Sequence, residues 1–290
     1  MPGSGQGIAI PSLTSGQFST VYNLFSLVIA SMLFTALFLL FSRGRVAGRY
    51  RNALVVSAMV CGIAAYHYFR IFDNFKASYP PGASVTAAHQ LSAVEFNEAY
   101  RYVDWFLTVP LLLIETVAVM ALGRAAQRSL LYKLVPASAL MIALGYPGEI
   151  ATSTGSRLLW GTLSTLPFIY LLYVLFVELS RSLVRQPPEV QHTIKMLRLA
   201  LVGLWGVYPI AYLFPVFGGF FAGADGFVLR QVGYSVADIL AKAAYGLAIY
   251  KIARVKSGIE EPAVYGDDEP DERPAIPVPA RAGDGHRTAV

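Results

Sequence analysis

The stretch RYVDWFLTVPLLLIE, residues 101–115, places charged side chains inside a long apolar run. On a helix that turns about 100° per residue, one face carries its polar side chains, namely Arg101, Asp104, Thr108 and Glu115. Polar residues on a membrane-spanning helix face the bundle interior, where they line paths for protons or ions. A carboxylate beside an arginine stays ionised, whereas a carboxyl in apolar surroundings without a cation stays protonated. The pattern predicts a proton acceptor at Asp104 and a stored proton at Glu115; a structural Arg101–Asp104 ion pair is the alternative reading.

A second charged pair, Asp238 and Lys242, stands in the apolar stretch YSVADILAKAAYGLAIYK. The i, i+4 spacing puts both side chains on one face of a helix. A lysine in the middle of a bilayer costs about 3 kcal/mol unless it is neutralised, paired or chemically modified. A desolvated lysine is the amine that forms a Schiff base with a carbonyl compound. Together with the acids of the first stretch, the pattern indicates a buried cation at Lys242 with Asp104 and Asp238 as counter-ions. A plain salt bridge from Lys242 to Asp238 is the simpler alternative.

The composition indicates that these residues lie in a membrane. Of the 290 residues, 55% are hydrophobic and 14% are charged, whereas soluble domains carry roughly a quarter charged residues. Seven apolar stretches have about the 20 residues that a helix needs to cross the hydrocarbon core. They lie at roughly 19–42, 52–73, 97–122, 131–150, 158–180, 194–217 and 230–253. We expect an all-α membrane protein with a bundle of seven transmembrane helices.

The connections between the stretches predict the orientation of the bundle. Basic residues gather in the loops after the first, third and fifth stretches, as at Arg43, Arg124 and Arg181, and such loops stay in the cytoplasm. The N-terminus is therefore expected outside and the C-terminus inside. These arginines account for the net charge of +5, so no nucleic-acid partner is expected. No Lys or Arg precedes Arg43, which argues against a cleavable signal peptide.

Three parts follow from this layout. Residues 1–18 are expected to be an extracellular segment and 19–255 the seven-helix domain. Residues 256–290 are rich in Pro, Asp, Glu and Gly, which favours a disordered cytoplasmic tail. The long connection 74–96 contains YPPG and a β-branched stretch that would suit a small hairpin.

Four motifs, in this order along the chain, carry a resemblance to microbial (type I) rhodopsins over roughly residues 19–255. R-Y-x-D-W-x-x-T-x-P-L-L-L from Arg101 resembles the third helix of that family, and WGTLSTLPFIYLLYVLF from Trp160 the fifth. W-G-V-Y-P-I-A-Y from Trp205 resembles the sixth helix, and D-x-x-x-K, ending at Lys242, the retinal-binding helix. The resemblance implies retinal bound covalently to Lys242 as a protonated Schiff base, no metal, and a light-driven ion transporter rather than an enzyme.

The triplet Asp104, Thr108 and Glu115 is similar to that of proton pumps in the proteorhodopsin and xanthorhodopsin branch, whereas sodium and chloride pumps and sensory members differ there. The resemblance implies outward proton transport, with Asp104 as acceptor and counter-ion and Glu115 as donor. It implies Asp238 as second counter-ion, Arg101 and Thr108 as partners of the acceptor, and His67 as a hydrogen-bond partner of Asp104. The segment GGFFAGADGFVLRQ lacks a clear match to the paired glutamates that release protons in archaeal pumps.

The resemblance also implies the retinal pocket, whose flat apolar walls suit a polyene. The matching positions are Tyr68, Trp105, Val109, Leu112, Met141, Gly145, Trp160, Ser164, Phe168, Trp205, Tyr208 and Tyr212. An apolar residue at Leu112 is similar to green-absorbing members. Gly161 has two readings: a window for an antenna carotenoid, as in xanthorhodopsin-like pumps, or a small residue that permits close helix packing.

Two other functions remain open on the sequence. A sensory photoreceptor on the same scaffold would need a transducer partner. A seven-helix transporter or receptor without a chromophore would stay colourless with added retinal. From the family we further expect membrane lipid around the bundle, a homo-oligomer (trimer, pentamer or hexamer) and a bacterial plasma (inner) membrane.

Overall fold

A computed structural model describes residues 10–80, 89–90, 92–120 and 122–266. Within these residues, seven helical segments are long and apolar enough to cross a membrane. The helices that form them are α1 (Ser15–Ser42), α2 (Gly48–Ser78), α3 (Tyr100–Val119), α4 (Arg124–Glu149), α5 (Thr154–Leu183), α6 (Pro188–Tyr212), α8 (Ala224–Asp238) and α9 (Tyr245–Glu260). The prediction of an all-helical membrane fold with seven spans is confirmed.

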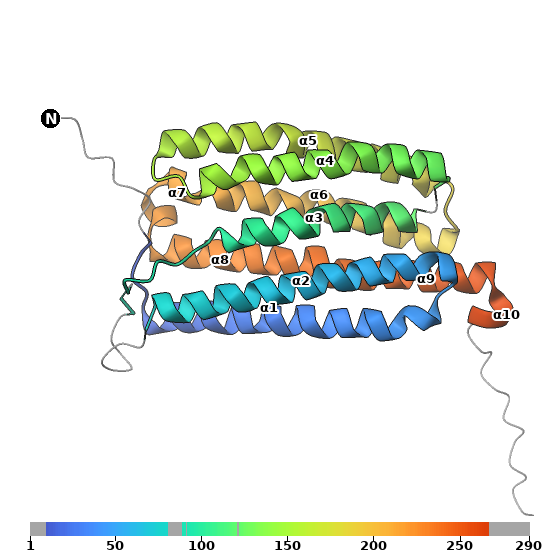
Figure 1. The fold of residues 1–290 in the computed structure, drawn as a ribbon, viewed down its shortest axis with the longest axis horizontal. Helices are drawn as coiled ribbons and strands as arrows, with labels where there is room; N and C mark the ends of the chain where they lie inside the picture. The colour runs from blue at the N-terminus through green and yellow to red at the C-terminus, as the bar shows by residue number, and fades with distance from the viewer. Residues whose placement is uncertain (1–9, 81–88, 91, 121, 267–290) are drawn as a thin grey trace, which may run out of the picture.

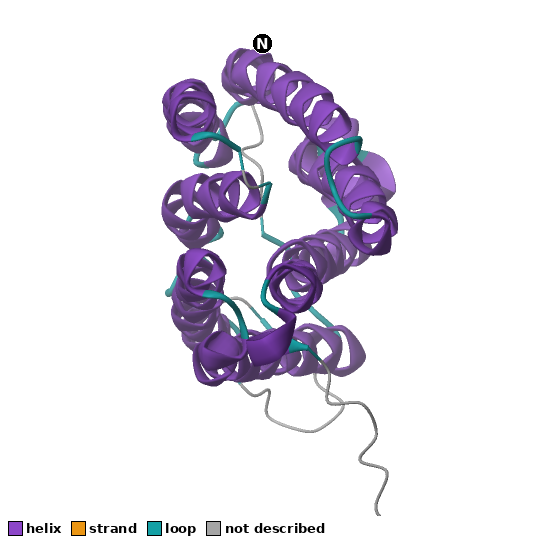
Figure 2. Cartoon of the chain, turned by 90° about the vertical axis from the view of Figure 1, so that its right-hand side faces the viewer, coloured by secondary structure: helices purple, strands orange, loops and turns teal. Residues whose placement is uncertain are grey.

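The spans pack as neighbours in chain order around a common interior. α1 lies against α2, α2 against α3, α3 against α4, α4 against α5 and α5 against α6. The last span, which contains α8 and α9, packs against α6 and also against α1, so it closes the ring. Figure 1 shows the helices side by side along the long axis, and Figure 2 shows the same bundle along that axis. Side chains on inner faces of distant segments can therefore meet.

The last span changes helix type where Lys242 stands. α8 ends at Asp238, a π-helical turn runs over Ile239–Ala244, and α9 continues from Tyr245. A π turn takes an extra residue into the helix and is frequent at functional sites. It shifts the face that the following residues present to the bundle. The amino-acid pattern gave no signal of this turn.

The ends of the spans differ from the sequence estimates. α1 begins at Ser15 because Thr14 and Gln17 form a capping box that satisfies free main-chain groups. α9 runs to Glu260 and is followed by the short helix α10 (Pro262–Tyr265), so the first ten residues of the expected tail, 256–265, are mostly helical instead. Lys256 and Ser257 are buried. Residues 1–9 and 267–290 of the expected terminal segments lie outside the described residues.

The connection between α2 and α3 also differs from its estimate. α2 extends to Ser78, five residues beyond the expected end near 73. The hairpin considered within 74–96 falls largely on residues 81–88 and 91, which lie outside the described residues. In the described part, Leu13 and His89 form a single antiparallel β-bridge.

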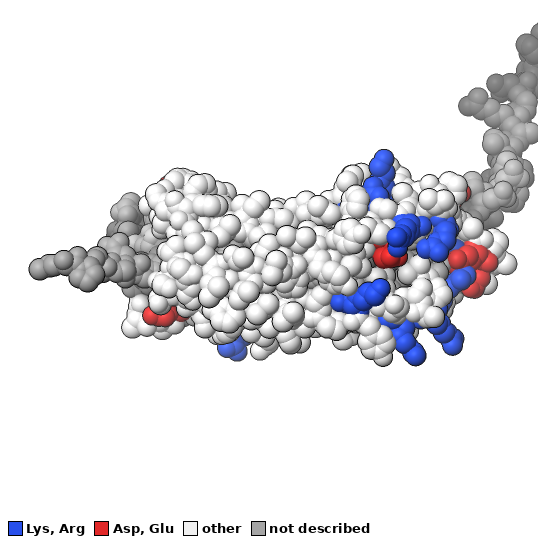
Figure 3. All heavy atoms as spheres, turned by 90° about the horizontal axis from the view of Figure 1, so that it is seen from above, with Lys and Arg blue, Asp and Glu red and all other residues white. Residues whose placement is uncertain are grey.

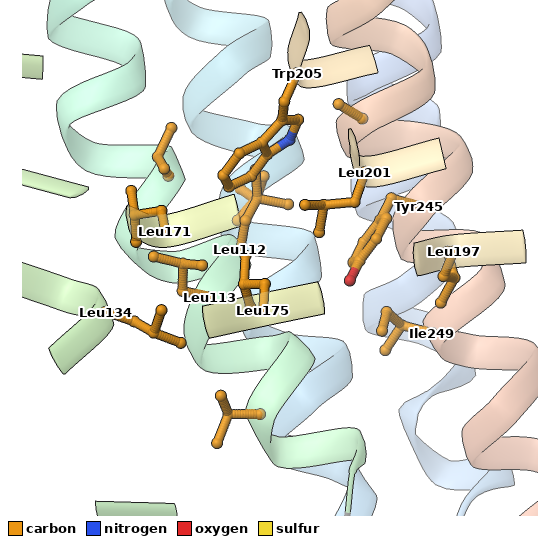
Figure 4. Close-up of a cluster of buried hydrophobic side chains, with 14 of the residues drawn as sticks. Leu112, Leu113, Leu134, Leu171, Leu175, Leu197, Leu201, Trp205, Tyr245 and Ile249 are labelled. Carbon is orange, nitrogen blue, oxygen red and sulfur yellow. The ribbon is translucent and has the colours of Figure 1, made fainter. Parts of the chain in front are cut away.

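An apolar cluster fills one half of the bundle. Figure 4 shows Trp205 at one end of this cluster and Ile249 at the other, with leucines of α3, α5 and α6 between them. Leu112, Leu171 and Leu201 are each at most 5% exposed. Packing of this kind excludes water from the interior, so polar groups on either side of the cluster are separated by a dry layer.

Basic side chains gather at one end of the bundle. In Figure 3 the Lys and Arg side chains of the visible face crowd towards the end where Figure 1 places α10. Exposed arginines follow α1, lie in the first turns of α4 and flank the end of α5, namely Arg43, Arg45, Arg124, Arg128, Arg181 and Arg185. These junctions lie at the same end of the bundle, as the positive-inside pattern requires of cytoplasmic loops.

Candidate functional site

Lys242 lies between two carboxylates in the bundle interior. Its Nζ is 2.5 Å from Asp104 Oδ2 and 3.0 Å from Asp238 Oδ1. The lysine side chain is 2% exposed, and the two acids are as deeply buried. Asp238 reaches the amine from the same span, four residues earlier, whereas Asp104 reaches it from α3. The two charged stretches of the sequence therefore meet at one nitrogen.

The two carboxylates differ in the number of donors that they meet. Tyr68 and Tyr208 each donate a hydrogen bond of 2.7 Å to Asp238, one to each oxygen, in addition to the contact with Lys242. Among the described residues, the Asp104 carboxylate accepts from Lys242 alone, and its Oδ1 is buried without a partner there. Asp238 is therefore held by three polar side chains, whereas Asp104 contacts the amine with one oxygen only.

Thr108 contacts the main chain of Asp104, as a partner of the acceptor on the same helix, whereas Arg101 contacts a different group from the one expected. Thr108 Oγ1 donates to the main-chain oxygen of Asp104 at 2.9 Å, which fixes the α3 backbone rather than the carboxylate. Arg101 forms no ion pair with Asp104, so the structural reading of that pair is wrong. Its Nη2 donates instead to Gln231 Oε1 at 2.6 Å, and its Cζ lies 5.1 Å from the ring centre of Tyr234.

A polar chain extends from Arg101 to the end of the bundle opposite α10. Gln231 joins Arg101 to Glu98, and Glu98 also forms an ion pair with Arg230. Arg230 lies in α8 and is 5% exposed. Sequence reasoning missed Glu98 and Gln231, because both stand at the very start of their predicted stretches, next to polar connections, where a polar residue is unremarkable.

His67 does not form the hydrogen bond to Asp104 that the family pattern implies. The imidazole is 8% exposed and its Nδ1 has no partner. The Asp104 oxygen Oδ1 is also without a partner, yet the two residues are not hydrogen-bonded. A bond between them would require one of the side chains to move.

Glu115 occupies an apolar site of its own. Its side chain is fully buried, Ser57 donates a hydrogen bond to its Oε2, and its Oε1 has no partner. No Lys, Arg or His in the described part of the chain forms an ion pair with it. Eleven residues separate Glu115 from Asp104, which is about 16 Å along α3. The neighbouring Thr116 hydroxyl shares a 2.7 Å hydrogen bond with Tyr245.

An internal cavity of about 250 Å³ begins at Lys242 and Asp238 and runs between α3, α4, α5 and α6. Its walls include ten of the twelve predicted pocket positions, namely Trp105, Val109, Leu112, Met141, Gly145, Ser164, Phe168, Trp205, Tyr208 and Tyr212. Gly161 lines it too, and so do residues that were not predicted, namely Tyr102, Ile142, Thr162, Thr165 and Tyr234. The cavity is thus a mostly aromatic and aliphatic slot with a buried amine at one end.

Two predicted pocket residues do not line the cavity. The Tyr68 hydroxyl donates a hydrogen bond to Asp238 instead. Trp160 packs towards α4, where a Cβ built on Gly148 would lie 3.0 Å from the Trp160 Cβ. Their sequence positions matched the family, but their side chains are directed elsewhere here.

Tyr212 is held in the cavity wall by a buried ion pair. Arg157 and Glu149 pair at 3.0 Å with almost no exposure, and Arg157 Nε donates to the main-chain oxygen of Tyr212 at 3.0 Å. The Tyr212 hydroxyl donates in return to the Arg157 main-chain oxygen at 2.7 Å. A Cβ at Gly161 would lie 2.7 Å from Tyr212 Cε1, so the glycine leaves room for this ring.

The cavity reaches the outer surface beside Gly161. Leu158, which lines it, is 43% exposed, and Thr162 on the same wall is exposed. Both residues stand on α5, where this helix faces the surroundings of the bundle. Gly161 therefore both accommodates Tyr212 and borders the opening.

Comparisons with known proteins identify the family of the chain. Residues 19–255 match the family described as bacteriorhodopsin-like protein. The green-light absorbing proteorhodopsin of a gamma-proteobacterium is 29% identical over 260 residues, which span 86% of this chain and 94% of that protein. Bacteriorhodopsin of Halobacterium salinarum is 32% identical over 176 residues, 60% of this chain and 64% of that one.

Solved structures show the same relationship. Xanthorhodopsin, described as a light-driven ion pump with dual chromophore, is 45% identical with a TM-score of 0.80, covering 87% of this chain and 99% of that one. A thermophilic rhodopsin is 44% identical with a TM-score of 0.82, covering 87% and 100%. The chain belongs to the bacteriorhodopsin-like family and is a microbial rhodopsin of the proteorhodopsin and xanthorhodopsin branch.

Proposed function

We propose that the protein is a light-driven outward proton pump that carries all-trans retinal on Lys242 as a protonated Schiff base. The observation that carries this proposal is the placement of the Lys242 amine, within 3.0 Å of two buried carboxylates, at the end of an apolar cavity. A long conjugated chain fits such a slot because its walls are aromatic and aliphatic. The Trp105 indole nitrogen in the wall also lacks a partner among the described protein groups.

The carboxylates would balance a cation at the Lys242 nitrogen. When bound, retinal supplies the light-driven isomerisation that changes how firmly, and towards which side, this nitrogen holds its proton. Asp104 Oδ2 is the acceptor, because it lies 2.5 Å from Nζ and has no other donor. Asp238 keeps its charge, because two tyrosine hydroxyls and the amine all bond to it.

Glu115 is the group that returns a proton to the Lys242 nitrogen. It is buried without a cation, which favours the protonated form, and Ser57 holds it in place. The apolar cluster of Figure 4 lies in the half of the bundle on its side of the cavity. Because water is excluded there, a proton from the other side does not leak back between transfers.

Release to the outside would use the polar groups around Arg101. Gln231 and Glu98 extend from Arg101 to the end of the bundle opposite the basic residues. A route through His67, implied by the family pattern, requires the His67 ring to move, because it does not contact Asp104 in this structure. Arg101 keeps a positive charge beside the path and disfavours a proton returning to Asp104.

The orientation belongs to the same proposal. The gathering of exposed arginines at the α10 end supports a cytoplasmic position for that end and for the C-terminus. Glu115 then lies on the cytoplasmic side of Asp104, which makes transport outward. Ring-shaped oligomers and a bacterial inner membrane stay predictions from the family.

An antenna carotenoid is the second candidate use of the cavity. The opening beside Leu158, Gly161 and Thr162 supports it, because a molecule seated there would meet the cavity end remote from Lys242. Purified pigment mixed with a carotenoid should then show carotenoid bands in the excitation spectrum of retinal-dependent signals. Absence of those bands, or their persistence in a Gly161→Trp variant, would leave Gly161 as a packing residue for Tyr212.

The test of pumping is an external pH measurement. Cells that express the protein with retinal should acidify an unbuffered medium in light, and a protonophore should abolish the acidification. A coloured pigment without acidification would favour the sensory photoreceptor. A protein that stays colourless with retinal would favour a transporter or receptor without a chromophore.

A further inference from the structure

A second buried lysine, Lys256, has no part in the mechanism above. It stands in α9, fourteen residues after Lys242, and is 3% exposed. No carboxylate of the described residues lies within ion-pair distance of its Nζ. A buried ammonium needs strong compensation, so its partners indicate what it is positioned to do.

The partners of Lys256 come from the ends of three other segments. Nζ donates to Gln186 Oε1 at 2.9 Å and to the main-chain oxygen of Val119, the last residue of α3, at 3.3 Å. It also lies 5.3 Å from the ring centre of Tyr50 on α2. Carbonyls at a helix C-terminus and the face of an aromatic ring both attract a cation. The ammonium thus draws α2, α3 and the α5–α6 connection onto α9.

Gln186 completes this arrangement on the α3 side. It is 6% exposed, and its amide nitrogen donates to the main-chain oxygen of Met120 at 3.1 Å. Lys256 and Gln186 therefore bind two successive main-chain oxygens at the end of α3, those of Val119 and Met120. We call Lys256, Gln186 and Tyr50 the Lys256 clasp.

The clasp closes the cytoplasmic side of Glu115. Val119 follows Glu115 by four residues, about one helical turn, in the direction of the basic end. Glu260 and Arg49 form an ion pair with each other, and Tyr50 donates to Glu260 at 2.8 Å. A proton that moves from the cytosol to Glu115 along α3 therefore passes a buried cation that forms no ion pair with a described carboxylate.

We propose that the Lys256 clasp is a gate on proton uptake: its positive charge and its hold on the end of α3 keep Glu115 closed to the cytosol in the dark. The inference rests on the proposed donor role of Glu115. Lys256 is a positioning residue, because it contacts neither the cavity nor the Lys242 nitrogen. Refilling of Glu115 then requires the clasp to loosen.

The experiment compares Lys256→Met with Lys256→Arg and with Lys251→Met, an exposed lysine of the same helix. The first readout is hydrogen–deuterium exchange at the Glu115 carboxyl in the dark, followed by its carbonyl stretch in infrared difference spectra. The second is the rate at which Glu115 refills after a flash, as a function of pH. An unchanged visible spectrum in the dark confirms that each variant is folded.

Lys256→Met should accelerate both rates by roughly tenfold, the effect of removing one unit charge beside the path at intermediate dielectric. Lys256→Arg keeps the charge and should behave as the parent protein, and so should Lys251→Met. Rates in Lys256→Met that equal those of Lys251→Met, or that are slower, would overturn the inference.

A second variant covers the case in which Lys256→Met yields no pigment. Gln186→Leu keeps the ammonium but removes the side-chain bonds of Gln186 to Lys256 and to Met120, and should still accelerate dark exchange, although by less. Unchanged exchange in that variant overturns the gate. Hydrogen–deuterium exchange in the dark does not depend on net transport. A protein that fails to pump but shows these exchange rates would therefore contradict the proposed pump and still support the gate.

Discussion

Asp104 of α3 and Lys242 of the last span face each other across the bundle with 2.5 Å between Oδ2 and Nζ. No sequence spacing links these two residues, which stand 138 positions apart. The contact makes Asp104 both the neighbour that balances the buried cation and the nearest base for its proton. Altering Asp104 should therefore act on the first proton transfer itself.

Replacement of Asp104 by asparagine should abolish transport while the pigment still forms. Loss of a positioned general base typically costs 100-fold or more, and we expect pumping to fall by roughly that factor. The absorption maximum should move to longer wavelength, because the lost anion stabilised the positive charge near Lys242. Light-driven acidification and the dark spectrum measure these effects. Transport above about a tenth of the parent rate would contradict the acceptor role.

Asp238→Asn provides the contrast. It weakens three contacts at once, with Tyr68, Tyr208 and Lys242, and each buried polar group left without a partner costs about 1–3 kcal/mol. The expected result is poor pigment formation and lower thermal stability rather than a stable, inactive pigment. Thermal bleaching of the visible band measures this stability. A bleaching temperature of Asp238→Asn as high as that of Asp104→Asn would argue against the structural role of Asp238.

Glu115→Gln should slow the return of a proton to the Lys242 nitrogen by roughly 100-fold, because the amide cannot donate the proton that the acid holds. The first transfer, to Asp104, should keep its rate. Flash photolysis separates the two steps. In a sensory photoreceptor the slow step would hardly change, so this variant also distinguishes the two functions.

The hydrogen bond from Ser57 gives a finer test of the same group. Ser57→Ala removes the only partner that the structure shows for the Glu115 carboxyl. A hydrogen bond of this kind contributes about 1 kcal/mol, so proton return should change by roughly fivefold, far less than in Glu115→Gln. An effect as large as that of Glu115→Gln would indicate that Ser57 itself carries the proton.

Arg157 should matter for stability and for the cavity wall. Arg157→Met leaves Glu149 buried and unpaired and removes the donor to the Tyr212 main chain. Breaking a buried pair in this way costs about 3–5 kcal/mol. The matched control is Arg181→Met, which removes an ion pair with Glu178 where the arginine is 68% exposed, and such pairs contribute about 1 kcal/mol or less.

Thermal bleaching of the two variants measures the difference. Arg157→Met should bleach at clearly lower temperature than the parent protein, and Arg181→Met at nearly the same temperature. Equal bleaching of the two would show that the Tyr212 clamp is not needed to hold the pigment.

Helical spacing and apolar run lengths predicted the bundle, the inner face of α3 and the Asp238–Lys242 contact, because these depend on local geometry. The partner of Arg101 could not be predicted in this way. Its alternatives, Asp104 and Gln231, lie on different helices, and the choice depends on how α3 and α8 pack. The π turn around Lys242 is likewise set by packing, since its sequence contains ordinary helix formers.

Lys256 shows how a boundary error hides a residue. Its segment has a polar composition, so the tail was expected to begin there, yet contacts with Tyr50, Val119 and Gln186 bury it. A polar composition indicates that a segment cannot bury itself by its own contacts. It does not show that residues from other helices can bury a lysine in that segment, as they do here. His67 is the opposite case. The family resemblance predicted a hydrogen bond from His67 to Asp104, and the structure does not contain it.

The attachment of retinal to Lys242 is the central claim, and borohydride reduction under light tests it most directly. Reduction fixes the pigment on the lysine that carries it, and peptide mass spectrometry then locates the added mass. The account predicts a retinyl group on the peptide that contains Lys242, and no visible pigment in a Lys242→Ala variant. An adduct on Lys256, the other buried lysine, or visible colour that survives Lys242→Ala would contradict it.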